Sequence, residues 1–473
     1  MTSSVSPSNA VAIADRLYRI KPERVATAVT LRQDTQSTTN HEQGNRELAI
    51  IKDEVLLWTD FLEGKLTEAG TRGRDRVMLI AAAYLENAPL ELCIRAAGEF
   101  DPRSDSSTRR FREGRSPRRR MRDVGVDVTP DDRAAFHSRP GLAMSAIHMD
   151  WHHWADERTE TRRWIERITS PGGVASQYTK QIGERLLELS RKAVDAPFFQ
   201  VLDTWTTSAD QNGQRVNVVA QLLTQSAVRD ELARDTHKKL LDWAKRGNAT
   251  QRQAVASVCS GPYGQRWPHV ALVRLRHILA VDDAATEVAA EAIARYAASG
   301  PTGLNRVVDT VESWLYRHPT HPAGPRAFLA LTDADKSPGV LSKLIGLAQQ
   351  SPAVREFLIS GWSTTLEQSD VRDRAYLSLV SWAQAVHTKR LDRDFVFGIL
   401  TAVRNAHEPV DAMSRFLYGV PEREDPALIS ARFALANLRT CQHSQCAQPD
   451  CPLQRGEHIN PIGAAGDLSA QEE

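Results

Sequence analysis

Positive charge is concentrated in one short part of the sequence. Eight arginines stand between residues 109 and 122, where Glu113 is the one acidic residue. They are Arg109, Arg110, Arg112, Arg115, Arg118, Arg119, Arg120 and Arg122. Arginine pairs with phosphate groups, and its planar guanidinium can contact the O6 and N7 of guanine together. The pattern allows two interpretations. One is a surface that binds nucleic acid or another partner. The other, which we favour, is a surface helix whose arginines are solvated or paired with acidic residues of the same protein.

A second cluster combines thiol and imidazole groups close together in the sequence. Its members are Cys441, His443, Cys446 and Cys451, with His458 a little further on. Thiolate and imidazole ligands suit Zn²⁺, which takes four of them in a tetrahedron. The spacing C-x-H-x2-C-x4-C differs from the usual pairs of CxxC, so the alternative is a polar tail with incidental cysteines. A structural zinc ion here is a hypothesis, and the sequence predicts no other cofactor.

The segment HMDWHHWADE, residues 148–157, places two histidines and an aspartate at helical spacing: His148, His152 and Asp156. Its apolar side chains define a competing face: Ile147, Trp151 and Trp154. The order of the polar residues is not the HxHxDH of metallo-hydrolases, and HExxH is absent. We therefore expect a helix that anchors its domain, in preference to a metal or acid–base site.

Sequence signatures of catalysis are otherwise missing. The chain contains neither a G-x-S-x-G elbow nor the phosphate-binding motif G-x-x-x-x-G-K-[ST]. Cys93 and Cys259 lie in apolar helical segments, which favours small core residues over nucleophiles. We expect a protein that is not an enzyme, with an enzyme of unknown class as the less favoured alternative.

The arginines belong to a recognisable order of elements. Residues 75–85 have apolar positions at helical spacing, and a second helix follows, with Asn87 as its N-cap and Pro89 in its first turn. Ser116 and Pro117 predict the start of the basic helix. VGVDV and RAAFHS, around a TPDD turn, predict two short strands. Helix, helix, basic helix and two-stranded wing make a winged helix, in which the basic helix has the position that enters the major groove.

The rest of the sequence has the pattern of successive amphipathic helices. In LNRVVDTVESWL one apolar stripe runs through Leu304, Val307, Val308, Val311, Trp314 and Leu315. Trp243, Trp362 and Trp382 also fit helical packing positions. The segments starting at Ala227 and Ala353 share an AVR(D/E) core, offset by 126 positions or three times 42. That period is typical of HEAT-like helical hairpins, which bury their stripes by stacking.

Residues 54–168 resemble a segment of actinobacterial STAND-type NTPases. The resemblance rests on DRVMLIAAAYLENAPLELCIRAAGEF, on RMRDVGVDV and on FHSRPGLAMSAIHMDWHHWADERTETRRWI. In that family a comparable winged helix follows the nucleotide-binding core, and helical repeats come after it. Because the phosphate-binding motif is absent, the family's nucleotide chemistry does not carry over. The resemblance implies the sensor region of such a protein without its nucleotide-binding core.

Composition limits the remaining possibilities. Sixty basic and 59 acidic residues leave a formal charge of +1, so attraction to nucleic acid must come from local patches. Apolar runs such as VMLIAAAYL fall short of the roughly 20 residues that span a bilayer. The first residues have no signal-peptide pattern. Five cysteines, three of them close together, do not predict a secreted disulfide framework. We expect a cytoplasmic protein that does not bind membranes.

The sequence thus predicts a mainly α protein: a winged-helix-like domain followed by a HEAT-like array of α-helical repeats. The expected divisions are a largely disordered segment 1–47, a domain 48–170, an array 171–440 and a tail 441–473. The expected function is that of a non-catalytic scaffold or regulator that binds a protein partner, in signalling or defence. The alternative is a DNA-binding regulator that uses the arginine-rich segment.

Overall fold

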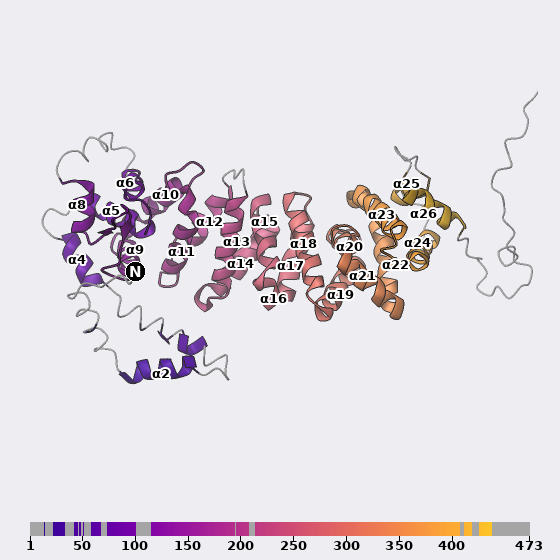
Figure 1. Cartoon of the computed structure of the whole chain (residues 1–473), viewed down its shortest axis with the longest axis horizontal. Coiled ribbons are helices and arrows are strands. Elements are labelled where there is room, and N and C mark those ends of the chain that lie inside the picture. Colours follow the sequence, from indigo (N-terminus) through magenta and orange to yellow (C-terminus); the bar gives the residue numbers. More distant parts are fainter. Residues whose placement is uncertain are drawn as a thin grey trace, which may run out of the picture. The chain divides into compact units, whose positions relative to one another are not determined.

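Helices make up most of the chain that the structure, a computed structural model, describes (Figure 1). The described residues are 14, 22–33, 42–45, 47–48, 51, 58–67, 73–100, 115–193, 195–207, 213–406, 411–418 and 425–437. The chain forms two compact units, Met1–Tyr296 and Ala297–Glu473. The expectation of a mainly α fold is confirmed. Within the described residues, no helix is both long and apolar enough to cross a membrane.

Unit 1 begins with short helices and one pair of strands, and continues with helices alone. Its elements are α2 (Pro22–Gln33), α4 (Thr59–Thr67), α5 (Gly73–Tyr84), α6 (Leu90–Gly98), α8 (Pro117–Asp123), β1 (Asp127–Val128), β2 (Ala134–Ala135), α9 (Leu142–His153), η1 (Ala155–Glu157), α10 (Arg158–Ile168), η2 (Ser176–Tyr178), α11 (Thr179–Ser190), α12 (Phe198–Thr207), α13 (Gln214–Ala227), α14 (Asp230–Arg246), α15 (Ala249–Ser260), α16 (Pro262–Arg266), α17 (Pro268–Leu279) and α18 (Ala284–Ala298), which contains the boundary between the units. α2 lies in the segment 1–47 that the sequence predicts to be largely disordered.

The two short strands pair as the sequence predicts. β1 and β2 are antiparallel, with Asp127 opposite Ala135 and Val128 opposite Ala134. Gly125 leads into β1 with a φ of +95°, and an added Cβ would stand 3.0 Å from the Phe61 ring and 3.1 Å from Leu142. Glycine is therefore required both by the backbone angle and by the close packing of α4 and α9.

One predicted helix cap is wrong. Asn87 adopts a left-handed backbone conformation with φ 67°, and its N–H donates to the Ala134 carbonyl at 2.7 Å. α6 begins at Leu90, directly after Pro89, and no side chain caps it. The Ala134 carbonyl of β2 accepts this hydrogen bond because β2 lies across the turn that precedes α6. Sequence spacing does not reveal this tertiary partner.

Later helices of unit 1 pack against their neighbours in alternation. α11 contacts α13, α13 contacts α15 and α15 contacts α17, while α14 packs on α13, α15 and α17. α15 starts with a capping box, in which Asn248 accepts from the Gln251 N–H and the Gln251 side chain accepts from the Asn248 N–H. Each helix thus buries its apolar stripe against the next helices in sequence.

Unit 2 continues the same kind of packing. Its elements are α19 (Pro301–Arg317), α20 (Ala323–Thr332), α21 (Pro338–Gln350), α22 (Pro352–Glu367), η3 (Ser369–Val371), α23 (Arg372–His387), α24 (Arg393–Ala406), α25 (Asp411–Tyr418) and α26 (Pro426–Asn437). α20 contacts α22, α22 contacts α24 and α24 contacts α26. The predicted apolar stripe of α19 is buried over its whole length.

Tryptophans anchor this core, as their spacing predicts. Trp362 and Trp382 are fully buried, and their rings meet edge to face at 5.2 Å. Phe328 packs edge to face on Trp362 at 5.5 Å, which joins α20 to α22. Trp314 of α19 is also buried in unit 2, and Trp243 of α14 is buried in unit 1. Edge-to-face pairs at these distances stabilise a core beyond the area they bury.

The two copies of the internal sequence match lie at different places relative to the helices. Ala227 ends α13 and Asp230 begins α14, whereas Ala353 lies in the first turn of α22. Leu240 and Leu366, which keep the same register, are both buried. Ala227 is buried whereas its counterpart Ala353 is exposed, so burial agrees at the two leucines and differs within the AVR core. A 42-residue repeat stays a prediction.

Candidate functional site

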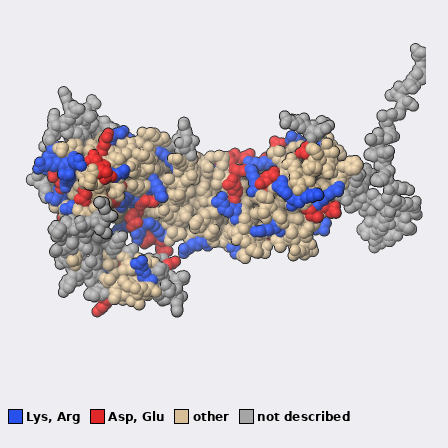
Figure 2. Space-filling view, viewed as in Figure 1, with Lys and Arg blue, Asp and Glu red and all other residues tan. Residues whose placement is uncertain are grey.

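Part of the arginine-rich segment forms α8 and the residues beside it. Arg109, Arg110 and Arg112 lie outside the described residues. Ser116 caps α8, since its side chain accepts from the Arg119 N–H and Pro117 occupies the first turn, as the sequence predicts. α8 packs on α5 and precedes β1. Figure 2 shows basic side chains gathered over the part of unit 1 that contains α8 in Figure 1, with acidic side chains beside them.

Arg120 faces inward and holds α8 in place. It is 7% exposed, its Nη1 lies 3.4 Å from Asp75 Oδ1 on α5, and its Nε donates to the Arg115 carbonyl at 3.0 Å. Met121 beside it is fully buried. A buried arginine without a carboxylate partner would destabilise the fold, so the Asp75 carboxylate is needed to keep Arg120 buried. Arg120 therefore orients the helix and offers nothing to a partner at the surface.

Two of the outer arginines have carboxylate partners within the protein. Arg115 Nη1 lies 2.9 Å from Asp123 Oδ2, and Arg118 Nη2 lies 3.1 Å from Asp132 Oδ1 in the turn between the strands. All four side chains are exposed, and exposed pairs contribute only about 0.2–1 kcal/mol. A phosphate or carboxylate of a partner can displace such weak pairing.

Arg119 and Arg122 have no acidic partner among the described residues, and both are exposed. They stand three positions apart, so they share one face of α8. Arg119 and Arg122 thus present two guanidinium groups without acidic partners among the described residues. Beside them, Arg115 and Arg118 are held only by weak ion pairs, and Arg120 fixes the helix. The arrangement can bind an anionic surface such as a phosphate backbone.

The histidine segment does not form a metal site among the described residues. α9 ends at His153 and Asp156 lies in the separate turn η1, so Asp156 leaves the face that His148 and His152 share. The rings of His148 and His152 stack at 6.3 Å. In the part of the chain that the structure describes, no three His, Cys, Asp or Glu side chains gather as metal ligands. The predicted zinc residues Cys441, His443, Cys446 and Cys451 lie outside the described residues.

α9 instead contributes to a buried ionic network that the sequence pattern does not reveal. Arg76 of α5 lies 3.2 Å from Asp150 and pairs with Glu157 of η1, and its guanidinium stacks over the Trp154 ring at 4.2 Å. Thr161 lies 3.5 Å from the Asp150 carboxylate. Burial raises the pKa of Asp150 to about 6, against the opposing attraction of Arg76. The network ties α5, α9, η1 and α10 together.

The two described cysteines are core residues, as their surroundings in the sequence predict. Cys93 and Cys259 are buried and free. Burial raises the pKa of each thiol to about 12, so both stay protonated at neutral pH. Neither thiol has the thiolate character of a nucleophile.

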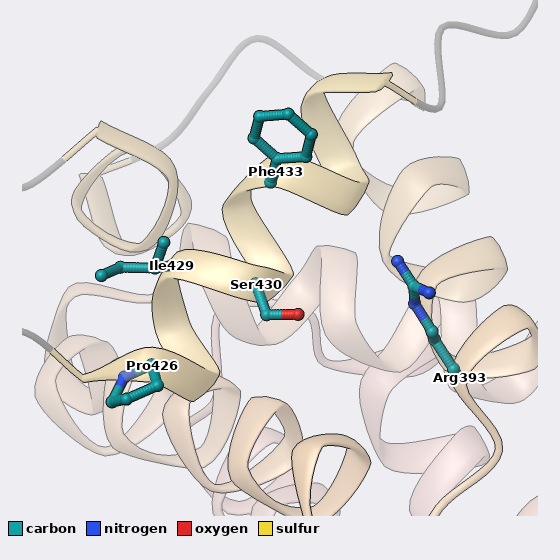
Figure 3. A pocket seen from close by; sticks show the side chains of 5 residues that line it. All are labelled: Arg393, Pro426, Ile429, Ser430 and Phe433. Atoms are coloured by element: carbon teal, nitrogen blue, oxygen red, sulfur yellow. The ribbon is translucent and has the colours of Figure 1, made fainter.

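A shallow apolar pocket lies in unit 2 between the start of α24 and one face of α26 (Figure 3). Its lining residues are Arg393, Pro426, Ile429, Ser430 and Phe433, and its volume is about 440 Å³. Phe433 is 69% exposed and Ile429 is 47% exposed. In Figure 3 Phe433 stands out from α26, while Ser430 is directed toward the side where Arg393 lies.

Sequence reasoning missed this surface, although α26 carries a signal for it. In PALISARFALAN the apolar residues occupy more than one face of the helix, whereas a surface helix normally has a single apolar stripe. Leu428, Ala431 and Leu435 are buried in unit 2, and Ile429 and Phe433 are left at the surface.

No family model, curated protein or solved structure matches this chain.

Proposed function

We propose that the chain is a non-catalytic helical scaffold that binds a protein partner through unit 2. The observation that carries the proposal is the open apolar face of α26, where Ile429 and Phe433 border a pocket. Large apolar side chains are scattered singly on most surfaces, whereas Ile429 and Phe433 lie together beside a pocket, which suits the docking of a partner.

The architecture that we propose for this scaffold has a winged-helix-like domain at residues 48–170 and a HEAT-like array at 171–440. The order of α5, α6, α8, β1 and β2 supports the former, and the packing of alternate helices supports the latter. Both agree with the resemblance to the sensor region of STAND-type NTPases. A role in cytoplasmic signalling or defence follows from that resemblance.

Cross-linking in the native cell tests the proposal. The tagged full-length chain is treated with an amine-reactive cross-linker before extraction, and the cross-linked peptides are identified by mass spectrometry. The proposal expects a stoichiometric partner linked to the exposed Lys343 and Lys389 of unit 2. The exposed Lys180 and Lys245 of unit 1 serve as the comparison. A chain that runs at its monomer mass in native extract, without a stoichiometric partner, contradicts the scaffold function.

A second candidate function is binding to a nucleic-acid backbone through α8. Arg119 and Arg122 favour it, because they are exposed and lack acidic partners in the described part of unit 1. A protein that neutralises Z phosphates of duplex DNA loses affinity with salt at a slope of about −0.9Z. Replacing both arginines by alanine should therefore make the slope shallower by about 2.

Fluorescence anisotropy with labelled duplex DNA at several salt concentrations measures that slope. The matched control is Arg234→Ala with Arg317→Ala, which removes two exposed arginines elsewhere. If the control changes the slope as much as the α8 variant does, α8 is not the binding surface.

A further inference from the structure

We infer that the pocket between α24 and α26 binds one amphipathic helix of a partner protein, and that this helix carries an acidic residue opposite Arg393. The inference rests on the proposed scaffold function and names the site and the chemistry of its partner.

α26 has the geometry of a helix with two packing surfaces. One surface is buried against α23, α24 and α25. The other presents the four pocket residues Pro426, Ile429, Ser430 and Phe433, which follow one another at i, i+3, i+4 and i+7. That spacing matches the register in which a second helix packs. α26 is the last helix among the described residues, and an outer face with apolar side chains at this spacing suits packing against one further helix.

The size of the surface fits one helix better than a second copy of the chain. Two large apolar side chains offer roughly 250 Å² to a partner when each is only partly exposed. A stable dimer buries about 800 Å² on each partner. Helix-in-groove recognition needs only a few anchors. A volume of about 440 Å³ accommodates one or two large side chains of the incoming helix.

Arg393 makes the pocket favour a partner with a negatively charged side chain. Among the five described residues that line the pocket it is the one with a charged side chain, and it is exposed at the start of α24. The described residues provide no carboxylate within ion-pair distance of it. An acidic residue beside the apolar anchors of the incoming helix therefore complements the pocket, and a basic residue opposes it.

Binding of synthetic helices to the full chain tests the inference. Three labelled peptides carry leucines at i, i+3, i+4 and i+7 and differ at one flanking position, which is Glu, Gln or Lys. Fluorescence anisotropy should show the Glu peptide binding about ten-fold more tightly than the Lys peptide. Arg393→Glu should reverse that order, and Phe433→Ser should weaken all three peptides by about ten-fold. Tyr316→Ser, which removes an 86% exposed aromatic elsewhere on unit 2, is the control and should change nothing.

Several results would overturn the inference. They are an absence of binding by all three peptides, an order that Arg393→Glu leaves unchanged, and an equal effect of Tyr316→Ser. A photo-cross-linking phenylalanine analogue at position 433 identifies other occupants. Capture of a second copy, or of residues 438–473 of the same chain, assigns the face to that occupant instead. If the native partner still cross-links to unit 2 in Phe433→Ser, the scaffold function stands and this pocket is not the site.

Discussion

Arg76 and Asp150 form a buried ion pair in which Arg76 Nε lies 3.2 Å from Asp150 Oδ1, with 11% and 7% of the two side chains exposed. The pair joins α5 to α9, and Glu157 and the Trp154 ring complete the surroundings of the guanidinium. Because the carboxylate is taken out of water, its charged form is disfavoured despite the arginine, and the pKa of Asp150 rises to about 6.

This pKa predicts a pH dependence of stability. The folded state holds the Asp150 proton more tightly than the unfolded state, where the pKa is about 3.9. The contribution of this group to the free energy of unfolding therefore rises as pH falls from about 6 to about 4, and is lost as pH rises through 6. Between pH 7.5 and pH 5 it amounts to about 1 kcal/mol.

Asp150→Asn removes that contribution, since asparagine does not titrate. Urea unfolding of both proteins at pH 7.5 and pH 5 measures it. The free energy of unfolding of the natural chain should gain about 1 kcal/mol relative to the variant on acidification. Equal changes in the two proteins would show that Asp150 is ionised throughout this range.

Arg120 and Arg119 are neighbours in α8 with opposite roles. Arg120→Ala leaves Asp75, which is 15% exposed, without its charge partner and should lower the free energy of unfolding by about 2–3 kcal/mol. Arg119→Ala removes an exposed side chain and should change it by less than about 0.5 kcal/mol. Denaturant titrations of the two variants make the comparison. Equal effects would contradict the inward orientation of Arg120.

Gly361 and Gly346 should respond in opposite directions to alanine. A Cβ at Gly361 in α22 would lie 2.3 Å from the Phe328 ring, whereas one at Gly346 in α21 meets nothing within 4 Å. Alanine favours a helix by about 0.5–1 kcal/mol over glycine, so Gly346→Ala should raise the free energy of unfolding. Gly361→Ala should lower it by about 1–3 kcal/mol, because the core must shift. Thermal unfolding distinguishes the two signs, and a stabilising Gly361→Ala would contradict the packing of α20 on α22.

Trp382 and Trp362 differ in one hydrogen bond. The Trp382 Nε1–H donates to the Thr332 carbonyl at 2.7 Å, while the Trp362 Nε1 is buried without a partner among the described residues. Replacement by phenylalanine removes a similar volume from each. Trp382→Phe should cost about 1 kcal/mol more than Trp362→Phe, because it leaves a carbonyl unpaired. A smaller loss for Trp382→Phe in urea unfolding would contradict this hydrogen bond.

The sequence alone predicted the local secondary structure at several places along the chain. The stripe of α19 is set by the 3.6-residue period, the start of α8 by Ser116 and Pro117, and the strand pair by short apolar runs on either side of a turn. Each of these depends on neighbours a few residues apart, and their chemistry is written in the sequence itself.

Contacts between distant residues were decided by the tertiary structure. The hydrogen bond that places Asn87 in a turn comes from Ala134, and the carboxylate that draws Arg120 inward comes from Asp75. The open face of α26 exists because the helices that pack on it cover one side. Residue type predicts that an arginine will pair with an anionic group and that a phenylalanine will be buried. Which anionic group pairs with it, and which side chains bury the ring, depend on how the helices pack in space.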